Sequence, residues 1–87
     1  MYQVSFKRKV LRDTQRIPKH VTKKLAALIE ALEEKGPIQI DWPNFSKLGT
    51  NQYHCHLTYH WVACWSHTKN TVTIEVYYVG SREKAPY

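Results

Sequence analysis

The sequence is poor in cysteine, glycine, methionine and acidic residues, with two Cys, three Gly, one Met and seven Asp or Glu among 87 residues. Two cysteines do not provide the disulfide framework of a small secreted domain, so we expect Cys55 and Cys64 to be reduced, buried and packed as small hydrophobic side chains. No apolar run approaches the roughly 20 residues of a membrane span, which excludes that class. The first residues, MYQVSFKRKV, lack the apolar centre of a signal peptide. The expected compartment is therefore the cytoplasm.

The length and charge of the chain limit its architecture and its partners. Eighty-seven residues suit one domain, residues 1–87, and leave no room for a second. Thirteen Lys and Arg residues give a formal net charge of +6, which indicates a polyanionic or acidic partner. The cations concentrate in the first quarter of the chain: Lys7, Arg8, Lys9, Arg12, Arg16, Lys19, Lys23 and Lys24. Such a cluster is either a solvated helical face or a surface that attracts phosphates.

The first two predicted elements are a short strand and a short helix. Apolar and polar residues alternate over the strand, as in a half-buried strand. Its apolar residues are Tyr2, Val4 and Phe6. The basic segment 7–15 predicts a helix with Val10, Leu11 and Thr14 on one side. Pro18 ends this helix, because proline disfavours the helical conformation in the residue before it.

The segment HVTKKLAALIEALEEKG, residues 20–36, predicts a longer helix. Its apolar residues follow helical spacing and form one stripe, which we interpret as core. The stripe consists of Val21, Leu25, Leu28, Ile29 and Leu32. Lys35 lies in the last turn, and Gly36 and Pro37 then end the helix.

The second half of the chain predicts a loop and three strands. Residues 37–51 read as a loop, because Pro37, Pro43 and Gly49 interrupt any regular element. Three strand-like runs follow, QYHCHL, WVACWS and TVTIEVYYV, separated by the turn-forming pieces TYH and HTKN. This order predicts an α+β fold, with the N-terminal strand and two helices packed on a mainly antiparallel four-stranded sheet.

Strand alternation divides the histidine-rich stretch YHCHLTYHWVACW, residues 53–65, between two faces. His54 and His56 face outward, because the alternate residues of their strand are apolar. Those inward residues are Tyr53, Cys55 and Leu57. In WVACW both sets are apolar, and volume favours Val62 and Cys64 for the packed core. The outward residues of that strand are then Trp61, Ala63 and Trp65.

The last strand completes this outer face. Its apolar set is expected to face the helices and consists of Val72, Ile74, Val76 and Tyr78. Its outward set consists of Thr71, Thr73, Glu75 and Tyr77. Arg82 and Tyr87 follow the strand and could fold over the same face. The predicted outer face is therefore cationic, aromatic and titratable, unlike an inert solvent face.

A metal site is one interpretation of this face. His54 and His56 are two residues apart on one face, which suits two metal ligands. Cys55 points to the opposite face, and no Cys or His spacing matches a zinc motif. A site on the outer face would need a third ligand such as Glu75. We predict no metal ion and no other cofactor.

Catalysis on RNA is the second interpretation. Such chemistry needs a base for a 2′-hydroxyl, a cation for the phosphorane and an acid for the leaving oxygen. His54 and His56 could act as base or acid near neutral pH. Arg82 provides a fixed charge that matches phosphate oxygens. Tyrosine and tryptophan side chains can stack on unpaired bases. Ordinary solvent-face histidines and an arginine paired with Glu75 remain the alternative.

At these residues the sequence resembles the RelE/ParE toxin superfamily, and specifically its RelE branch. The similarity covers nearly the whole chain, from the first strand and basic helices through WPNFSKLGTNQYHCHL to IEVYYVGSREKAPY. The tail is the most specific part, with an apolar strand end, then Gly, then Arg-Glu and a near-terminal Tyr.

The resemblance implies a toxin of a type II toxin-antitoxin system, encoded beside an antitoxin that wraps and silences it. Members of the RelE branch enter the ribosomal A site and cleave mRNA without a metal, leaving a 2′,3′-cyclic phosphate on the upstream fragment. The alternating basic positions of the family, lysines in its best-studied members, fall on His54 and His56. Its phosphate-binding arginine falls on Arg82 and its C-terminal tyrosine on Tyr87. The implied partners are an antitoxin, the ribosome with mRNA, and operator DNA only through the antitoxin complex.

The chain departs from the family pattern at two places. Trp61 stands near a position that is often arginine, at the start of the third strand of the family. The tail from Arg82 to Tyr87 is one residue shorter than in some members and contains Pro86.

We interpret the chain as a ribosome-dependent mRNA endoribonuclease. His54 and His56 are the candidate base and acid, Arg82 holds the scissile phosphate and Tyr87 orients the nucleotide. Candidates for contact with ribosomal RNA or bases are Lys7, Arg8, Lys9, Arg12, Trp61 and Tyr77. The alternative is a non-catalytic protein, either a ParE-like inhibitor of DNA gyrase or a degenerate toxin that only binds its antitoxin and operator DNA.

Overall fold

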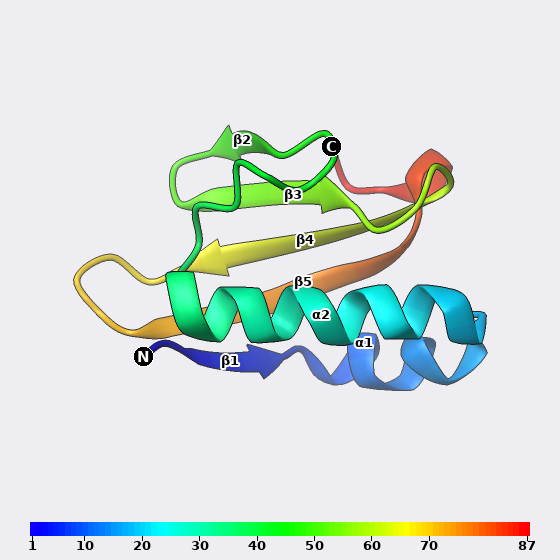
Figure 1. The fold of residues 1–87 in the computed structure, drawn as a ribbon, viewed down its shortest axis with the longest axis horizontal. Coiled ribbons are helices and arrows are strands. Elements are labelled where there is room, and N and C mark those ends of the chain that lie inside the picture. Colours follow the sequence, from blue (N-terminus) through cyan, green and yellow to red (C-terminus); the bar gives the residue numbers. More distant parts are fainter.

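A computed structural model describes all of residues 1–87 (Figure 1). The strands are β1 (Gln3–Phe6), β2 (Ser46–Gly49), β3 (Gln52–His56), β4 (Trp61–His67) and β5 (Thr73–Ser81). The helices are α1 (Arg8–Asp13) and α2 (Lys19–Lys35), and the short 3₁₀ turns are η1 (Thr14–Arg16) and η2 (Arg82–Lys84). The strands form one sheet in the order β1-β5-β4-β3-β2. β1 runs parallel to β5 and every other pair is antiparallel, so the α+β prediction is confirmed.

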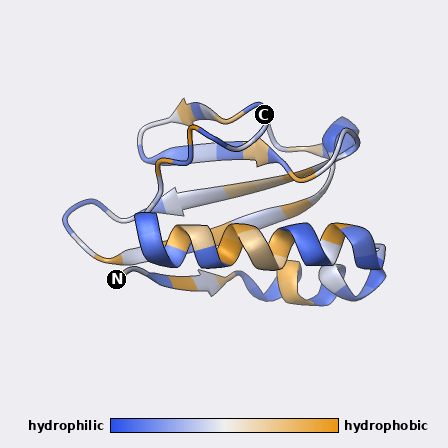
Figure 2. Cartoon of the chain, viewed as in Figure 1, coloured by the Kyte–Doolittle hydropathy of each residue, from blue (hydrophilic) through white to orange (hydrophobic).

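Both predicted helices are present. The short helix α1 ends at Asp13 and is followed by the 3₁₀ turn η1, which ends where Ile17 takes an extended conformation before Pro18, as predicted from the proline. The longer helix spans Lys19–Lys35 and buries Val21, Leu25, Leu28 and Leu32. Figure 2 shows hydrophobic and hydrophilic residues mixed along α2, in keeping with an amphipathic helix. Neither helix is long and apolar enough to cross a membrane.

The end of α2 is held by one glycine and one buried amide. Gly36 has φ of 89°, and a Cβ there would lie 2.7 Å from the ring of Tyr2. The positive φ favours glycine, and a side chain at this position would also displace the ring of Tyr2, just before β1. The buried side chain of Gln39 donates to the carbonyl oxygens of Ala31 and Gly36, at 3.0 and 2.8 Å. These bonds satisfy backbone groups that helix ends leave unpaired.

The core lies between α2 and one face of the sheet. Leu28 and Leu32 from the helix meet Ile74 and Val76 from β5, and all four are fully buried. Leu11 was predicted on the buried side of the short helix, but 54% of it is exposed. α1 has only six residues, and Val10 alone fills its contact with the core.

The segment 37–51 is not entirely a loop as predicted. Ser46–Gly49 forms β2, which pairs antiparallel with β3 at the sheet edge. The prolines and the glycine that suggested a loop flank four residues that are free to pair. The hydrogen bonds of the neighbouring strand, rather than local preference, make this segment a fifth strand.

The predicted orientation of β4 is wrong, because Trp65 and Ala63 belong to the core cluster. Trp65 is fully buried, stacks with Phe45 and Tyr53 at centroid distances of 6.1 and 6.4 Å, and donates its indole N–H to the Pro37 carbonyl at 3.0 Å. Volume matching favoured the wrong set, because the small side chains of Cys55 and Ala63, cross-strand neighbours on this face, leave space for the indole. Trp61 also packs partly against the core.

The outer face of β4 consequently carries small residues. Cys64 lies opposite His54, and Val62 lies opposite His56. Residues directly opposite in a ladder share a face. Both are fully buried but stand outside the helix-facing cluster.

The predicted orientation of Tyr78 in β5 is wrong, because the strand contains a β-bulge. Trp65 pairs with Val76 and Cys64 pairs with Tyr78, which leaves Tyr77 unpaired between them. An extra residue of this kind shifts the alternation beyond it. Val79 therefore takes the core position predicted for Tyr78, and Tyr78 lies on the outer face. Val72 precedes the strand and is 49% exposed, so it is not the core residue we predicted.

Substitutions at one buried and one exposed leucine test this packing. Leu28→Ala should lower the free energy of unfolding by about 2–5 kcal/mol, because it leaves a cavity in the core. Leu11→Ala, the matched control, should change it by less than about 0.5 kcal/mol. Urea denaturation at neutral pH measures both. Equal effects of the two substitutions would contradict the described core.

Candidate active site

The candidate site lies on the face of the sheet opposite α2. His54 and His56 both point to this face from β3, as predicted, and their ring centroids are 5.9 Å apart. The C-terminal tail folds over the same face and brings Tyr87 to His54. In Figure 1 the C-terminus lies on the β2–β3 side of the fold.

His54 is the buried member of the pair, with 7% of its surface exposed. Its Nδ1 shares a hydrogen bond of 2.9 Å with Ser46 Oγ, and the ring of Tyr87 lies 4.4 Å from its own. Burial lowers the pKa of His54 below its ordinary value of 6.5, and the nearby His56 lowers it further, while the Ser46 backbone opposes both effects. His54 is therefore a neutral imidazole at neutral pH.

His56 and Arg82 line one open cavity of about 320 Å³. Pro43 and Asn44 line it from the loop before β2, where the Pro43 carbonyl accepts the His56 backbone N–H at 2.8 Å. Arg82 enters from η2, whose first N–H donates to the His60 carbonyl at 2.8 Å. The loop before β2 and the 3₁₀ turn η2 thus place the imidazole of His56 and the guanidinium of Arg82 at one cavity.

Tyr59 is a member of the site that the sequence did not identify. It lies in the β3–β4 turn, is 69% exposed and also lines the cavity. The Arg82 guanidinium stacks on its ring at 4.8 Å from the centroid, a cation–π contact that orients the cation. The only sequence signal was an aromatic residue in a short hairpin turn, and turn patterns do not show which strand end lies beside them.

Tyr87 reaches the histidines although the tail is short and contains Pro86. About half of its surface remains exposed, so its ring covers His54 on one side and faces solvent on the other. Burial raises the pKa of its hydroxyl, with Cys64 and Tyr78 raising it further and Arg82 lowering it. The hydroxyl is therefore protonated at neutral pH and can donate a hydrogen bond.

The two cysteines are free and buried, as expected. Cys55 faces the helices, and Cys64 lies on the other face as the direct cross-strand neighbour of His54. Burial raises the pKa of each thiol to about 12, so neither is a thiolate at neutral pH. Across the chain, no three His, Cys, Asp or Glu side chains come together as metal ligands would.

The other predicted contact residues do not join this cavity. Lys7 precedes α1, and Arg8, Lys9 and Arg12 lie within it and are exposed. None of these four lines the cavity of His56 and Arg82. The prediction that Trp61 lies on the histidine face is wrong, because β4 presents it to the core side. Tyr77 is half-buried. Burial raises the pKa of the Tyr77 hydroxyl, and Cys64 raises it further.

Comparison with known proteins gives structural relatives only. No family model matches the sequence, and no curated protein matches it either. The isolated RelE toxin of E. coli superposes with a TM-score of 0.77 at 17% identity, covering 99% of this chain and 89% of that one. RelE in the RelE-RelB complex of Pyrococcus horikoshii gives 0.76 at 16% identity, covering 97% and 98%.

The E. coli DinJ-YafQ toxin-antitoxin complex adds a match of 0.76 at 13% identity, covering 99% of this chain and 98% of that one. In these three matches the agreement covers 89% or more of each chain. The chain has the RelE toxin fold. The α+β fold implied by the sequence resemblance is therefore confirmed.

His54 should make the stability of this RelE-like domain depend on pH. An unfolded histidine titrates near 6.5, and the folded pKa of His54 is lower. Its contribution is therefore fully present above pH 6.5 and is lost as the pH falls through the folded pKa. His54→Asn keeps a hydrogen-bonding atom near Ser46 but cannot titrate. Urea unfolding between about pH 5 and 8 should give the variant a flatter curve. A constant difference between the two proteins would contradict this assignment.

Proposed function

We propose that this protein is a toxin of a type II toxin-antitoxin system that cleaves mRNA on the ribosome. The observation that carries the proposal is the cavity that His56 and Arg82 both line, together with the contact of the Tyr87 ring with His54 on the same face of the sheet. The RelE fold supports it, because toxins of that fold have been solved with the antitoxins RelB and DinJ. The proposed partners are an antitoxin, mRNA in the ribosomal A site, and operator DNA through the antitoxin complex.

The proposed reaction is attack of a ribose 2′-oxygen on the adjacent phosphorus. The 2′-O–P bond forms as the P–O5′ bond breaks, giving a 2′,3′-cyclic phosphate and a 5′-hydroxyl. One proton leaves the 2′-hydroxyl for a base and another reaches the 5′-oxygen from an acid. His56 is accessible from the cavity and takes one of these roles. Arg82 binds the phosphate and stabilises the charge on the phosphorane.

The two histidines have different proposed roles. His54 is covered by Tyr87 and bonded to Ser46, so we assign it to holding the tyrosine in place. The protonated Tyr87 hydroxyl then orients the nucleotide or donates the second proton. Tyr59 is exposed beside Arg82 and offers its ring edge to a base without losing the cation. No group in this scheme requires a metal ion.

Mapping of 5′ ends in a purified translation reaction tests the proposal. The unmodified protein should produce new ends within codons only when ribosomes are present. His56→Ala and Arg82→Ala should each lower the cleavage rate by about 100-fold or more, because each removes a group that acts in the transition state. The upstream fragment should accept a 3′ adapter only after the cyclic phosphate has been removed.

Two exposed residues of α2 provide matched controls. His20→Ala and Lys24→Ala remove a histidine and a cationic side chain that do not line the cavity, and both should leave cleavage unchanged. Absence of new ends at any protein concentration would contradict the proposal. So would cleavage that persists at a near-normal rate in folded Arg82→Ala.

We also propose that the cationic side chains around α1 bind the phosphates of ribosomal RNA. They are Lys7, Arg8, Lys9 and Arg12, all of them exposed. The double substitution Lys7→Glu, Lys9→Glu should weaken binding to ribosomes and lower the salt slope of log affinity by about one for each phosphate that the protein no longer neutralises. Lys23→Glu, Lys24→Glu on α2 changes the net charge equally and is the control. Equal binding by both variants would contradict the assignment.

A further inference from the structure

The cavity of His56 and Arg82 also contains an uncharged amide that the proposed cleavage does not use. Asn44 lines this cavity from the loop before β2, whereas Tyr59 lines it from the turn after β3. Both residues are exposed, so a ligand in the cavity can reach the amide and the aromatic ring. The two segments that carry them are distant in the sequence and meet only in the folded chain.

A tight turn holds Asn44 in place. The Trp42 carbonyl accepts the Phe45 N–H at 3.2 Å, which closes the turn. Pro43 and Asn44 are its two central residues, and Asn44 has φ of 55°, a conformation that asparagine and glycine adopt more readily than other residues. Phe45 then stacks on Tyr53 of β3 at a centroid distance of 5.8 Å. The turn is thus fixed to the sheet, and glycine could replace Asn44 without changing its backbone.

Two neighbours orient the ring of Tyr59. The Arg82 guanidinium lies 4.8 Å from its centroid, and the His60 ring meets it at 4.8 Å and 73°. The Tyr59 side chain nevertheless remains 69% exposed, so much of the ring is free for another planar group. Aromatic side chains held in this way are platforms on which unpaired bases stack.

The size and charge of the cavity suit one nucleotide. Its volume of about 320 Å³ lies near the lower limit of cavities that bind small organic ligands. No carboxylate lines it, and Arg82 supplies a fixed positive charge. A phosphate is therefore favoured at Arg82, which leaves Tyr59 and Asn44 for the attached nucleoside.

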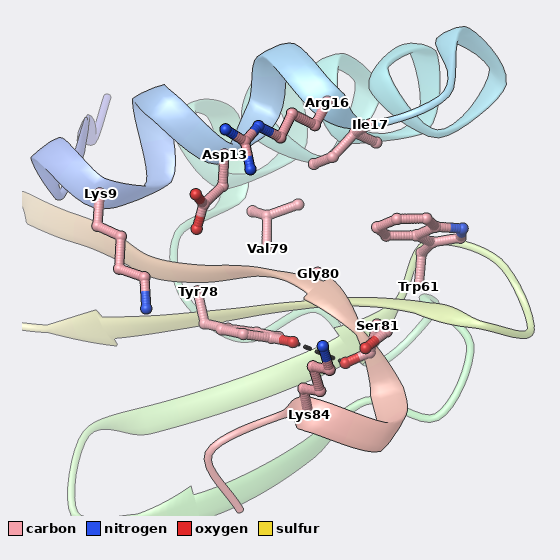
Figure 3. A pocket seen from close by; sticks show the side chains of 10 residues that line it. All are labelled: Lys9, Asp13, Arg16, Ile17, Trp61, Tyr78, Val79, Gly80, Ser81 and Lys84. Carbon is pink, nitrogen blue, oxygen red and sulfur yellow. Dashed lines mark hydrogen bonds between the residues drawn. The ribbon is translucent and has the colours of Figure 1, made fainter.

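A larger cavity of about 500 Å³ lies between α1 and the end of β5 (Figure 3). It shares no lining residue with the cavity of His56 and Arg82. The Tyr78 hydroxyl at this larger cavity already donates to the Ser81 carbonyl at 2.7 Å (Figure 3). A base bound there would not belong to the nucleotide whose phosphate contacts Arg82. Base recognition next to the reaction is therefore sought in the smaller cavity.

From these features we infer that Tyr59 and Asn44 bind the base of a nucleotide next to the scissile phosphate, and that Asn44 selects adenine. This inference rests on the proposed cleavage for the position of the phosphate. An asparagine amide has one donor group and one acceptor. Adenine offers the N6 amino group as donor and N7 as acceptor on one edge, so both halves of the amide can pair at once.

The other bases match the amide less well on that edge. Guanine presents two acceptors, O6 and N7, which suit a cation better than an amide. Cytosine presents only its amino group and uracil only a carbonyl oxygen, so each leaves half of the Asn44 amide unpaired. A purine ring also covers more of the Tyr59 ring than a pyrimidine does.

Titration of the isolated protein with mononucleotides tests the inference without ribosomes or cleavage. The probes are the monophosphates of adenosine, guanosine, cytidine and uridine, with the phosphate at the 3′ or the 5′ position to represent either side of the scissile phosphate. Binding is followed by NMR of the ¹⁵N-labelled protein. One adenosine isomer should bind roughly tenfold more tightly than the corresponding isomers of the other three nucleosides. It should also shift the side-chain amide resonances of Asn44.

Substitutions in two turns separate the amide from the backbone. Asn44→Gly keeps the left-handed conformation but removes the amide, so it should lower the adenosine affinity roughly tenfold, to that of the other nucleotides. Asn70→Gly is the matched control, because Asn70 also has a positive φ, of 64°, in an exposed turn and does not line the cavity. This control should keep the preference for adenine.

Substitutions of Tyr59 test the aromatic contact. Tyr59→Leu should weaken the binding of all four nucleotides by roughly tenfold, because it removes the ring on which each base stacks. Tyr59→Phe keeps the ring and should bind them as the unmodified protein does.

Mapping of 5′ ends on ribosomes separates this inference from the proposed cleavage. Cuts by the unmodified protein should be enriched about tenfold next to adenine, and Asn44→Gly should abolish the enrichment. Cuts without a base preference, together with equal binding of the four nucleotides, would overturn the inference and leave the cleavage in place. A preference for another base, or one that persists in Asn44→Gly, would also overturn it. Adenine-selective binding through Asn44 without any cleavage would instead contradict the proposed function and support the adenine site.

Discussion

Burial of Trp65 is the constraint on which the rest of this structure depends. The indole is the largest fully buried side chain, and its N–H needs an acceptor that the core rarely offers. The Pro37 carbonyl, just beyond the end of α2, provides that acceptor. This bond joins the sheet to the helix end, where Gly36 and the amide of Gln39 complete the turn. The loop after the helix is thereby fixed above β3 and β4.

Because side chains alternate along a strand, the burial of Trp65 also determines which β4 residues lie on the opposite face of the sheet. Because Trp65 faces the core, the adjacent Cys64 must point to the opposite face, where it lies beside His54 on the neighbouring strand. A small thiol there, rather than an indole, leaves room for Tyr87 to lie on the histidine ring. The chemistry of the candidate site therefore depends on the burial of Trp65 on the other side of the sheet. The same burial that excludes water lowers the pKa of His54 and keeps its imidazole neutral.

Residues of η2 line two separate cavities. Arg82 at its start lines the cavity of His56, whereas Lys84 at its end lines a second cavity of about 500 Å³, beside Tyr78 and Gly80. Within β5, the bulge at Tyr77 reverses the faces of the strand residues that follow. Tyr78 then packs on Gly80, and Val79 enters the core in its place.

The sequence by itself determined the elements with strong local signals. Helical spacing and the Gly36-Pro37 stop defined α2, and the apolar alternate residues of β3 placed His54 and His56 outward. The positions of Arg82 and Tyr87 just after the last strand suggested that the tail could fold over the same face. Tertiary structure alone decided the orientation of β4, whose residues are apolar on both sides, the bulge in β5 and the pairing of β2. The physical reason is that alternation has two equivalent solutions when both faces are apolar. Only the space between distant segments, filled by one indole and one tyrosine, selects between them.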